Sequence, residues 1–373
     1  MRVYLDNNAT TRIHPAVLDA LDDSLQNVYG NASSIHKEGQ AARRRIEEAR
    51  ESVASLIGST AREIVFTSGG TESNNAALFG AAGTGGIHHI VTTAIEHPSV
   101  LEPLQELQRR GHRVTFVPPS RDGAVDAQAM LAALRDDTRL VAMMLTNNET
   151  GVIQPVGEVA RVCRERGIHV HCDAVQAAGK IDLDVSSLAV DSMALSAHKI
   201  HAPKGIGALY VRKGLALERH MFGGAQERRR RAGTENVPLA VAFGVAATLA
   251  RDAAPRAHVT GLRDRLEREL RDERITVNGA AAARVPNTSS ITFRDADGEG
   301  IVIALDLAGI AVSTGSACSS GRVEPSPVLM AMGLTEEEAK STVRVSLSRM
   351  TTEEEVARAV LVLREVLPRC RQA

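Results

Sequence analysis

Short apolar runs alternate with helical patterns through the first half of the chain, and this alternation restricts the fold more than any other feature. The runs at residues 63–66, 89–91, 113–117, 140–145 and 169–172 are short and rich in β-branched side chains, which is typical of buried strands. Amphipathic stretches with helical spacing separate them. Strands that alternate with helices form βαβ units around a parallel sheet. We therefore predict an α/β fold whose large domain is built on a mainly parallel sheet.

The pattern changes after a helix-like run at residues 239–250. Residues 251–258 are charged and contain a proline, and strand-like segments follow at 285–293 and 310–312. Residues 352–366 have the spacing of an amphipathic terminal helix with three glutamates in its first turn. We place a domain boundary at 251–258 and predict a smaller α+β domain at the C-terminal end.

Charge and aromatic content narrow the classes of function. The 44 basic and 45 acidic side chains leave a net charge of −1, so no overall field attracts nucleic acid or an anionic membrane. Without tryptophan, the chain has few platforms on which bases could stack. The first residues lack the apolar stretch of a signal peptide, and no later stretch is a membrane span by composition. We expect a cytoplasmic protein that binds neither membranes nor nucleic acid.

A glycine-containing segment follows the first strand and precedes a helical run at residues 76–82. Gly69 and Gly70 let the backbone approach a ligand closely, and Thr71 adds a hydroxyl donor at the N-terminus of the helix. This geometry binds phosphate. A plain turn between strand and helix fits the same residues, because they match neither a dinucleotide-binding fingerprint nor a P-loop.

Two further strand ends carry charged residues. Asp173 ends a buried strand and needs a cationic partner there, which a protonated pyridine nitrogen would supply; capping of the next helix explains it equally well. Lys199 follows Ser196, Ala197 and His198 after another strand, where desolvation and nearby positive charge would lower its pKa and favour a Schiff base. Taken alone, Lys199 has the sequence environment of a surface lysine.

The order of these residues favours one shared site. His97 also stands at a strand end, where its imidazole could stack on a pyridine ring and move protons, although an isolated histidine is more often structural. Asn147 and Asn148 end another strand, where an amide could contact substrate or simply form a turn. The carboxyl ends of parallel strands meet at one edge of a sheet. Phosphate loop, His97, Asp173 and Lys199 in succession therefore predict a pyridoxal phosphate (PLP) enzyme in which Lys199 holds the cofactor as a Schiff base.

The four cysteines are far apart and form no CxxC pair, so neither a zinc site nor a redox dithiol is predicted. Cys163 falls in a helical pattern, Cys172 in a strand and Cys370 in the C-terminal tail. Cys318 differs, because it stands in a run of small residues that predicts a mobile loop with an accessible thiol. We predict that Cys318 is the reactive cysteine.

Together these motifs resemble the cysteine desulfurases of the NifS/IscS type, within the class V aminotransferase-like PLP enzymes. The resemblance runs nearly from end to end and is specific. It rests on Tyr-Leu-Asp-Asn-Asn-Ala-Thr-Thr at 4–11, Gly-Gly-Thr-Glu-Ser-Asn-Asn at 69–75, Glu-His-Pro at 96–98, Asp-Ala-Val-Gln at 173–176, Ser-Ala-His-Lys at 196–199, Arg-Ala-Gly-Thr-Glu-Asn at 231–236, Gly-Ser-Ala-Cys at 315–318 and Arg-Val-Ser-Leu at 344–347. It implies the aspartate-aminotransferase-like fold, with a large PLP-binding domain at 13–250 and a small domain, 1–12 with 251–373, that carries the mobile cysteine loop.

The resemblance also implies a role for each matching residue. Gly70, Thr71, Ser196 and His198 would hold the phosphate, His97 would stack on the ring, Asp173 would pair with the pyridine nitrogen, Gln176 would contact the phenolic oxygen, and Lys199 would carry the cofactor. Asn148 and Arg344 would bind the substrate carboxylate. Thr234 would reach the phosphate of a neighbouring subunit, which implies a homodimer.

The implied reaction converts L-cysteine to L-alanine. Lys199 would move the α-proton, and Cys318 would take the sulfur as a persulfide and deliver it to an acceptor protein, such as an iron-sulfur scaffold or a tRNA thiolation enzyme. Two alternatives stay open: another PLP lyase or transaminase, such as a selenocysteine lyase in which Cys318 is incidental, and a scaffold that has lost turnover. The chain departs from the family pattern at Ala202, at Ser348, and at 229–230, where two arginines fill a place usually held by glycine and a variable residue.

Overall fold

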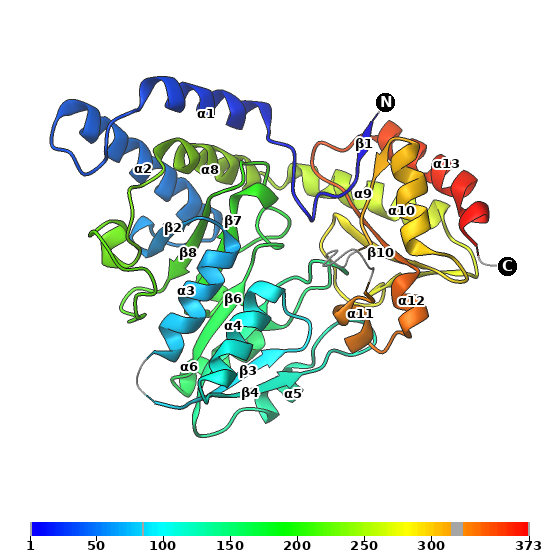
Figure 1. Ribbon diagram of the computed structural model, residues 1–373, viewed down its shortest axis with the longest axis horizontal. Helices are drawn as coiled ribbons and strands as arrows, with labels where there is room; N and C mark the ends of the chain where they lie inside the picture. Colours follow the sequence, from blue (N-terminus) through cyan, green and yellow to red (C-terminus); the bar gives the residue numbers. More distant parts are fainter. Residues whose placement is uncertain (1, 84–85, 315–323, 372–373) are drawn as a thin grey trace.

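The computed structural model describes residues 2–83, 86–314 and 324–371. A seven-stranded sheet forms its larger part, in the order β2-β8-β7-β6-β5-β3-β4 (Figure 1). The strands are β2 (Ile64–Thr67), β3 (His89–Thr93), β4 (Arg113–Val117), β5 (Thr138–Met144), β6 (His169–Asp173), β7 (Ser192–Ser196) and β8 (Gly207–Val211). Strands β4, β3, β5, β6 and β7 run parallel, and only β8 pairs antiparallel, with β2 and β7. The predicted α/β fold with a mainly parallel sheet is confirmed.

Helices cover both faces of this sheet, because successive side chains along each strand point to opposite faces. On β5, Leu140 and Ala142 pack in a cluster with α3 and α4, whereas Val141 and Met143 belong to the cluster on the other face. Long helices α2 and α8 pack against each other beside the sheet. The helices of this part are α1 (Pro15–Asn27), α2 (Lys37–Leu56), α3 (Gly70–Ala82), α4 (Pro98–Arg109), α5 (Ala127–Ala132), α6 (Val156–Glu165), α7 (Val185–Leu188) and α8 (Val237–Ala250), with the short 3₁₀ turns η1 (Ala61–Glu63), η2 (Ala197–Lys199) and η3 (Glu227–Arg229).

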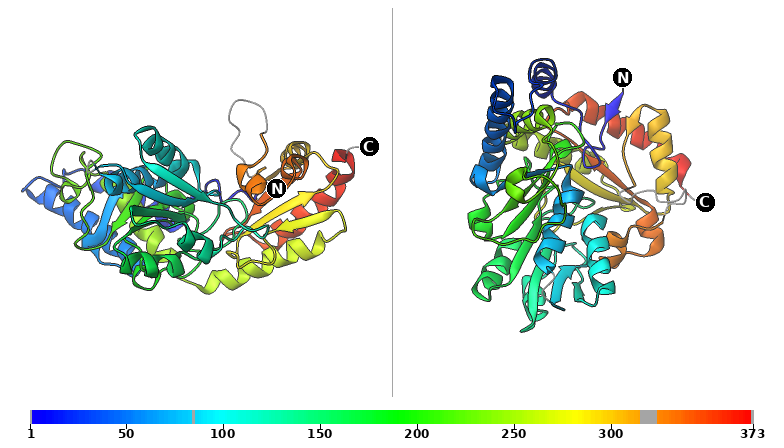
Figure 2. Two further views of the ribbon diagram at one scale, coloured as in Figure 1. Left: turned by 90° about the horizontal axis from the view of Figure 1, so that it is seen from below. Right: turned by 60° about the vertical axis from the view of Figure 1, so that its left-hand side comes forward.

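A three-stranded antiparallel sheet forms the core of the smaller part, and Figure 2 shows the two parts at opposite ends of an elongated molecule. The first strand of the chain belongs to this smaller part, because β1 (Val3–Tyr4) pairs in parallel with β11 (Ile310–Ala311). The remaining elements are β9 (Ile275–Asn278), β10 (Thr288–Phe293), β12 (Thr342–Ser346), α9 (Ala254–Glu269), α10 (Gly298–Leu307), α11 (Pro327–Ala331), α12 (Glu336–Lys340) and α13 (Glu353–Cys370).

The hydrophobic clusters bear on the proposed division into domains at 13–250 and at 1–12 with 251–373. One cluster joins Val3 and Leu5 to apolar side chains between residues 259 and 367. The cluster around the large sheet, however, also takes in Val328 and Leu329 of α11. The same cluster contains Ala339 of α12, so the division that we propose leaves several apolar side chains of the small domain, between residues 328 and 339, inside the large core.

Two helices begin earlier than the sequence predicts. Helix α3 begins at Gly70 and not at residue 76, and α9 begins at Ala254, inside the segment that we read as a boundary. Helix α13 follows the expected start: Thr352 Oγ1 accepts from Glu355 N at 3.2 Å, and the Glu355 carboxylate accepts from Thr352 N at 2.9 Å. This capping box satisfies two backbone donors that the first turn leaves unpaired.

Over the part of the chain that the structure describes, no single helix is long and apolar enough to cross a membrane. Helices α8 and α9 reach the necessary length and composition only as a pair, and they are bent by 74° relative to each other.

The two arginines that depart from the family pattern occupy contrasting backbone conformations. Arg229 has φ 63°, in the left-handed region that costs a side chain roughly 1–2 kcal/mol, whereas Arg230 has φ −89°. We predict that R229G raises the free energy of unfolding by about 1 kcal/mol, because glycine adopts the left-handed region without that cost. R230G is the matched control and should lower it by about 0.5–1 kcal/mol. Chemical denaturation of both variants measures this; equal effects would contradict the strain at Arg229.

Candidate active site

The predicted site residues meet at the carboxyl ends of β5, β6 and β7, where open α/β sheets bind their ligands. A pocket of about 210 Å³ lies there, between these strand ends and the first turns of α3 and α4. The structure thus brings together side chains spread over more than a hundred positions of the chain. The predicted residues that line it are Gly70, Thr71, His97, Asn148, Asp173, Gln176, Ser196, His198 and Lys199.

One end of the pocket has the features of an anion site. Helix α3 begins there, and its N-cap residue, Gly69, has no side chain to cap the amides of the first turn. A Cβ on Gly70 would come within 2.7 Å of Val175 Cγ2, so only glycine lets the helix end lie this close to the strand ends. The Ser196 and His198 side chains line the same region.

His198 is neutral in this environment. Its Nδ1 lies 3.1 Å from Thr10 Oγ1. Burial, together with the positive charges of Lys199 and Lys204, lowers the pKa of His198 to about 4. At neutral pH the imidazole therefore serves the pocket as a hydrogen-bonding group and not as a fixed charge.

Asp173 ends β6 with both carboxylate oxygens engaged. Its Oδ2 accepts from Asn74 Nδ2 at 2.8 Å, and its Oδ1 accepts from Val175 N at 3.0 Å. The side chain is 7% exposed and lines the pocket. Because each oxygen keeps a further lone pair, the carboxylate can still accept from a cationic N–H in the pocket.

A buried chain of hydrogen bonds orients Asn74, the partner of Asp173. Asn74 donates through Nδ2, so its Oδ1 is the acceptor for His171 Nε2 at 2.9 Å, and His171 Nδ1 must accept from Ser192 Oγ at 2.9 Å. Burial lowers the pKa of His171 to about 3, which agrees with this single neutral tautomer. Ser192 Oγ in turn lies 2.8 Å from His169 Nε2. The chain fixes the direction in which Asn74 presents its donors.

The same network sets the tautomer of His97. His97 Nδ1 accepts from Ser99 N at 3.0 Å, as the N-cap of α4, and lies 2.8 Å from Ser99 Oγ. Ser99 Oγ itself accepts from Asn74 Nδ2 at 2.8 Å. Nδ1 is thus an acceptor and the ring proton lies on Nε2. Burial lowers the pKa of His97, with the positive charge of Lys199 acting in the same direction and Asp173 acting against it.

Lys199 ends the 3₁₀ turn after β7, and its amine points to the N-terminal segment. Nζ donates to the carbonyl oxygens of Asn8 at 2.5 Å and Ala9 at 2.8 Å. Burial and the nearby guanidinium of Arg344 lower its pKa to about 8, against the opposing charges of Asp173 and Asp6. A neutral, nucleophilic amine is therefore accessible just above neutral pH.

This pKa makes a measurable prediction for the ligand-free protein. Acylation by a limiting amount of acetic anhydride requires the neutral amine, so labelling of Lys199 should reach half its maximum near pH 8. An unstructured lysine peptide added to the same mixture is the control, because its amine has the ordinary lysine pKa of about 10.4. Peptide mass spectrometry after labelling at several pH values gives both curves. Coincident curves would contradict the lowered pKa of Lys199.

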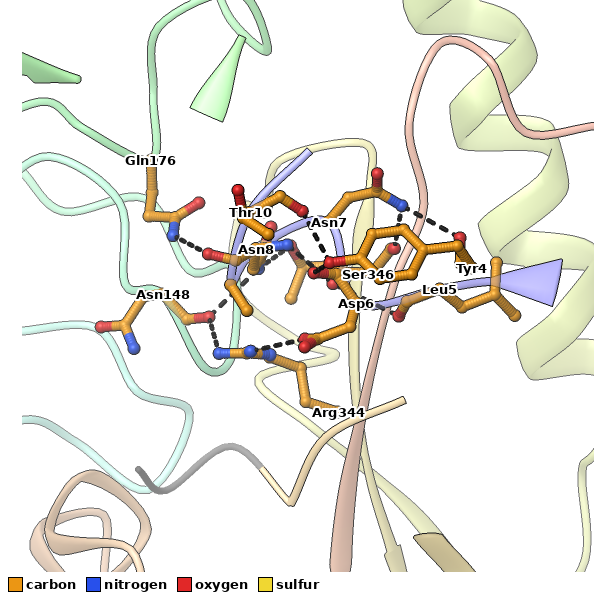
Figure 3. A network of polar contacts seen from close by, with 12 residues as sticks. Tyr4, Leu5, Asp6, Asn7, Asn8, Thr10, Asn148, Gln176, Arg344 and Ser346 are labelled. Carbon is orange, nitrogen blue, oxygen red and sulfur yellow. Dashed lines mark hydrogen bonds and ion pairs between the residues drawn. The ribbon is translucent and has the colours of Figure 1, made fainter. Parts of the chain in front are cut away.

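Arg344 reaches the site from β12 of the small sheet, and Figure 3 shows it between Asp6 and Asn148. One terminal nitrogen donates to Asp6 Oδ1 at 2.9 Å and the other to Asn148 O at 3.1 Å. The side chain is 6% exposed, and within the described residues its Nε has no hydrogen-bond partner. Thr146 Oγ1, on the pocket wall, is likewise buried and unpaired there. Buried polar atoms without a partner among the described residues are uncommon, and both atoms can accept a polar contact from a bound ligand.

Among the described residues, Thr234 and Arg344 are not part of the lining of this pocket, and one member of the asparagine pair has a structural role. Thr234 lines a different pocket, with Ser68 and Glu235, and within one chain it does not reach the site. Cys318 lies outside the described residues. Asn147 forms a turn, because its Oδ1 accepts from the amides of the next residues, whereas Asn148 lines the pocket.

The three cysteines that the structure describes are free thiols. Cys163 and Cys172 are fully buried, and burial raises the pKa of the Cys163 thiol to about 11 and that of Cys172 well above its ordinary value. Cys370 ends α13, where burial also raises its pKa. None of these thiols has the electropositive, accessible surroundings of a reactive cysteine.

Four residues at the site were not predicted from the sequence. Asn74 and Ser99 orient Asp173 and His97, while Asn8 and Lys180 contact Lys199 or Gln176. Asn8 and Asn74 fell within recognised motifs, which is the only signal the sequence held. Polar residues in mid-helix or in the N-terminal segment show their role only once the fold brings them to the site.

The model of the class-V aminotransferases matches residues 3–359 of the chain. The chain belongs to the class-V aminotransferase family. The class V aminotransferase-like family that the motifs indicated is thereby confirmed. Among its relatives, the cysteine desulfurase of Trichormus azollae is 45% identical over 374 residues, which cover 99% of this chain and 94% of that protein.

Solved structures agree with this family assignment. A structure titled "NifS-like protein" has a TM-score of 0.92 and 37% identity, covering 98% of this chain and 99% of the other. A structure titled "SspA in complex with cysteine" has a TM-score of 0.84 and 34% identity, covering 94% and 100%. The class-V aminotransferase fold, with its large mainly parallel sheet, therefore extends over nearly the whole chain.

Proposed function

We propose that this chain is a cysteine desulfurase that converts L-cysteine to L-alanine and transfers the sulfur to Cys318. The observation that carries the proposal is the pocket itself, in which a lysine with a lowered pKa, a buried carboxylate and a neutral imidazole face one another. Relatives that bear this name and match the chain over 99% of its length support it. The persulfide would pass to a sulfur acceptor for iron-sulfur cluster assembly or tRNA thiolation.

The residues around the pocket fit pyridoxal phosphate. The uncapped first turn of α3, with Gly70, Thr71, Ser196 and the neutral His198, suits a phosphate group. Asp173, oriented by donors on both oxygens, suits a protonated pyridine nitrogen. When bound, the cofactor would supply an electron sink for the charge that develops on the substrate α-carbon. Gln176 would contact its phenolic oxygen, and Lys199 would hold it through its amine.

Lys199 is the group that we expect to move the α-proton. Its pKa of about 8 lies close to neutral pH, which suits an amine that both accepts and returns a proton. His97, with its proton on Nε2, would lie against the cofactor ring and serve as a second proton donor. Arg344 Nε, buried and unpaired within the described chain, would bind the substrate carboxylate together with Asn148.

Cys318 would take the sulfur. Its thiolate attacks the sulfur of bound L-cysteine, so that a sulfur–sulfur bond forms while the carbon–sulfur bond of the substrate breaks. The substrate carbon gains a proton and leaves as L-alanine, and the overall balance is L-cysteine plus a thiol giving L-alanine plus a persulfide. The buried state of Cys163 and Cys172 supports Cys318 as the acceptor.

A homodimer completes this proposal. Thr234 lies outside the pocket of its own chain, and in a dimer it would reach the phosphate held by the partner subunit. Large apolar side chains exposed on the single chain support a second copy, because they would be covered in an interface. They include Leu18, Leu25, Tyr29, Ile35 and Phe222.

Amino-acid analysis tests the reaction. L-alanine should form from L-cysteine, with an equal amount of sulfide released when excess dithiothreitol is present to reduce the persulfide. L-selenocysteine, tested side by side, separates a desulfurase from a selenocysteine lyase, because only the desulfurase depends on Cys318. Alanine formation from L-selenocysteine alone would refute our proposal, and no turnover of either amino acid by a protein saturated with pyridoxal phosphate would favour a scaffold.

A further inference from the structure

The N-terminal segment crosses between the two parts of the molecule at the site (Figure 3). Before the crossing, Asp6 forms a parallel bridge with Ser346 of β12. After it, Thr11 N donates to His198 O at 3.0 Å, beside the turn that carries the lysine. Asn8 lies between these attachments and is 2% exposed. Its contacts therefore join the small sheet to the pocket.

Every hydrogen-bonding position of the Asn8 side chain is occupied. Its Nδ2 donates to Asn148 O at 3.1 Å and to Thr288 Oγ1 at 2.8 Å. Its Oδ1 accepts from Lys180 Nζ at 2.9 Å and from Asn287 Nδ2 at 3.0 Å. An asparagine amide offers two donors and two acceptor lone pairs, and all four are used. Aspartate, the isosteric acid, offers no donor, so it would set a carboxylate oxygen against the Asn148 carbonyl and lose the bond donated to Thr288 Oγ1.

The backbone of Asn8 reaches the reactive amine. Its carbonyl oxygen accepts from Lys199 Nζ at 2.5 Å and from Gln176 Nε2 at 2.9 Å. Its amide nitrogen donates to Ser346 Oγ at 2.9 Å, which anchors the residue to β12. A free Lys199 amine is thus held by a residue whose own position depends on the small sheet.

The side chain of Asn8 reaches the guanidinium at the other end of the site. Asn148 O accepts from both Asn8 Nδ2 and Arg344, at 3.1 Å each. Asp6, two residues before Asn8, accepts from the other terminal nitrogen of Arg344 at 2.9 Å. The segment therefore contacts the two groups that the proposed reaction uses for its proton and its carboxylate.

We propose that Asn8 is a positioning residue that, supported by Asp6, fixes the Lys199 amine relative to the Arg344 guanidinium. This inference rests on the proposed function, which assigns the α-proton to Lys199 and the substrate carboxylate to Arg344. Asn8 acts through its contacts with Lys199 and Asn148 and takes no part in bond making. A shift of this segment relative to either part of the molecule would change the position of the Lys199 amine relative to the Arg344 guanidinium.

Asn7 provides a matched control for a variant of Asn8. It is the neighbouring residue, it is 4% exposed, and its Nδ2 donates to Ser346 O at 2.8 Å and to Tyr4 O at 3.3 Å. Substitution by aspartate removes two donated hydrogen bonds at either position. Only at position 8 does the change affect the neighbours of Lys199.

The test measures the pKa of Lys199 in the full-length, cofactor-free protein by the pH dependence of acetic anhydride labelling. In N8D the new carboxylate contacts Lys180 and belongs to the residue whose backbone carbonyl accepts from Lys199, so the pKa of Lys199 should rise by about one unit. In N7D it should rise by less than half as much. An N8D curve that coincides with the wild-type or N7D curve would overturn the proposal. The charged and titratable groups that act on Lys199 or are acted on by it are Arg344, Asp173, Asp6, Lys180, His97 and His198.

The holoenzyme gives a second readout. In N8D the kcat/KM for L-cysteine should fall roughly tenfold at pH 7 and recover in part toward pH 9, because a raised amine pKa is overcome by alkali. A uniform loss at all pH values, equal to that of N7D, would indicate a merely structural role and overturn the proposal. If wild type forms no alanine but the labelling shift of N8D persists, the proposed function fails and the positioning role stands.

A more exposed residue keeps the proposal testable where N8D does not accumulate as a folded protein. The Asp6 carboxylate is 20% exposed, and its charge raises the pKa of Lys199. D6N should therefore lower that pKa below the wild-type value, and it should raise KM for L-cysteine more than it lowers kcat, because Arg344 loses its support. An unchanged Lys199 labelling curve in D6N would overturn the proposal.

Discussion

K199A is expected to lose at least about a thousandfold of the rate of L-alanine formation from L-cysteine. The variant removes both the amine that would hold the cofactor and the base that would move the α-proton, and positioned acid–base catalysis alone contributes roughly 10²–10⁴-fold. The fold should survive, because Lys199 donates only to two backbone carbonyls of the N-terminal segment and adds nothing to the sheet. Amino-acid analysis of the reaction mixture measures the rate.

The exposed Lys213 is the control for this loss, and K213A should match the wild-type rate. Sodium borohydride adds a readout that is independent of turnover, because it fixes an amine-linked cofactor irreversibly to its lysine. Peptide mapping after reduction should find the added mass on Lys199 in the wild type and nowhere in K199A. Cofactor fixed to Lys180 or Lys204 would contradict the assignment of Lys199.

D173N is expected to lower kcat/KM for L-cysteine by roughly 10²–10³-fold, the effect of removing one preorganised electrostatic group from an enclosed site. The carboxylate would no longer pair with a protonated pyridine nitrogen. The variant also loses a hydrogen bond, since both Asp173 oxygens accept from donors and an amide must turn its NH₂ toward one of them. That mismatch should cost about 1–3 kcal/mol of folding stability.

Asp191 separates the two effects in D173N. It is equally buried, at 3% exposure, and both of its oxygens also accept, from Val170 N at 2.9 Å and from Arg212 Nε at 2.7 Å. It precedes β7 at the edge of the sheet opposite the pocket, because β7 ends at Ser196 on the pocket wall. D191N should therefore be destabilised while retaining turnover. Equal losses of turnover in both variants would mean that Asp173 serves the fold alone.

Much of the fold follows from local patterns in the sequence. Strand β5 appears where a short apolar run predicts it, because burial on both faces of a parallel sheet demands continuous apolar side chains. The start of α13 could be predicted for a different reason. Thr352 and Glu355, which are three positions apart, form a capping box. Both signals depend only on residues close in sequence.

Other boundaries depend on tertiary packing, which local patterns do not contain. Helix α3 extends through Ser73 and Asn74, poor helix formers that are fully buried against the strand ends. The charged segment that suggested a linker belongs largely to α9, whose Val259 and Leu262 pack into the small core. In both cases burial of a helix face outweighs the preferences of individual residues.

The residues of the site also fall into two groups, those that the sequence predicts and those that only tertiary packing brings to the site. Residues at strand ends, such as Asp173 and Lys199, could be grouped from their order alone, because a parallel sheet gathers its strand ends at one edge. Their hydrogen-bond partners could not be predicted, because these partners are far apart in the sequence. Asn74 and Asp173 are separated by 99 positions, and Asn8 and Lys199 by 191. These partners contribute through geometry, and only the folded chain specifies that geometry.

Peptide mass spectrometry can locate the sulfur atom that L-cysteine gives up, which we expect on Cys318. After the holoenzyme reacts with L-cysteine and free thiols and persulfides are alkylated, the peptide with Cys318 should carry one additional sulfur atom. The peptides with Cys163, Cys172 and Cys370 should carry none, and C318A should form no protein persulfide while still binding pyridoxal phosphate. An added sulfur on one of the other cysteines, or sulfur transfer to an acceptor that persists in C318A, would contradict the account.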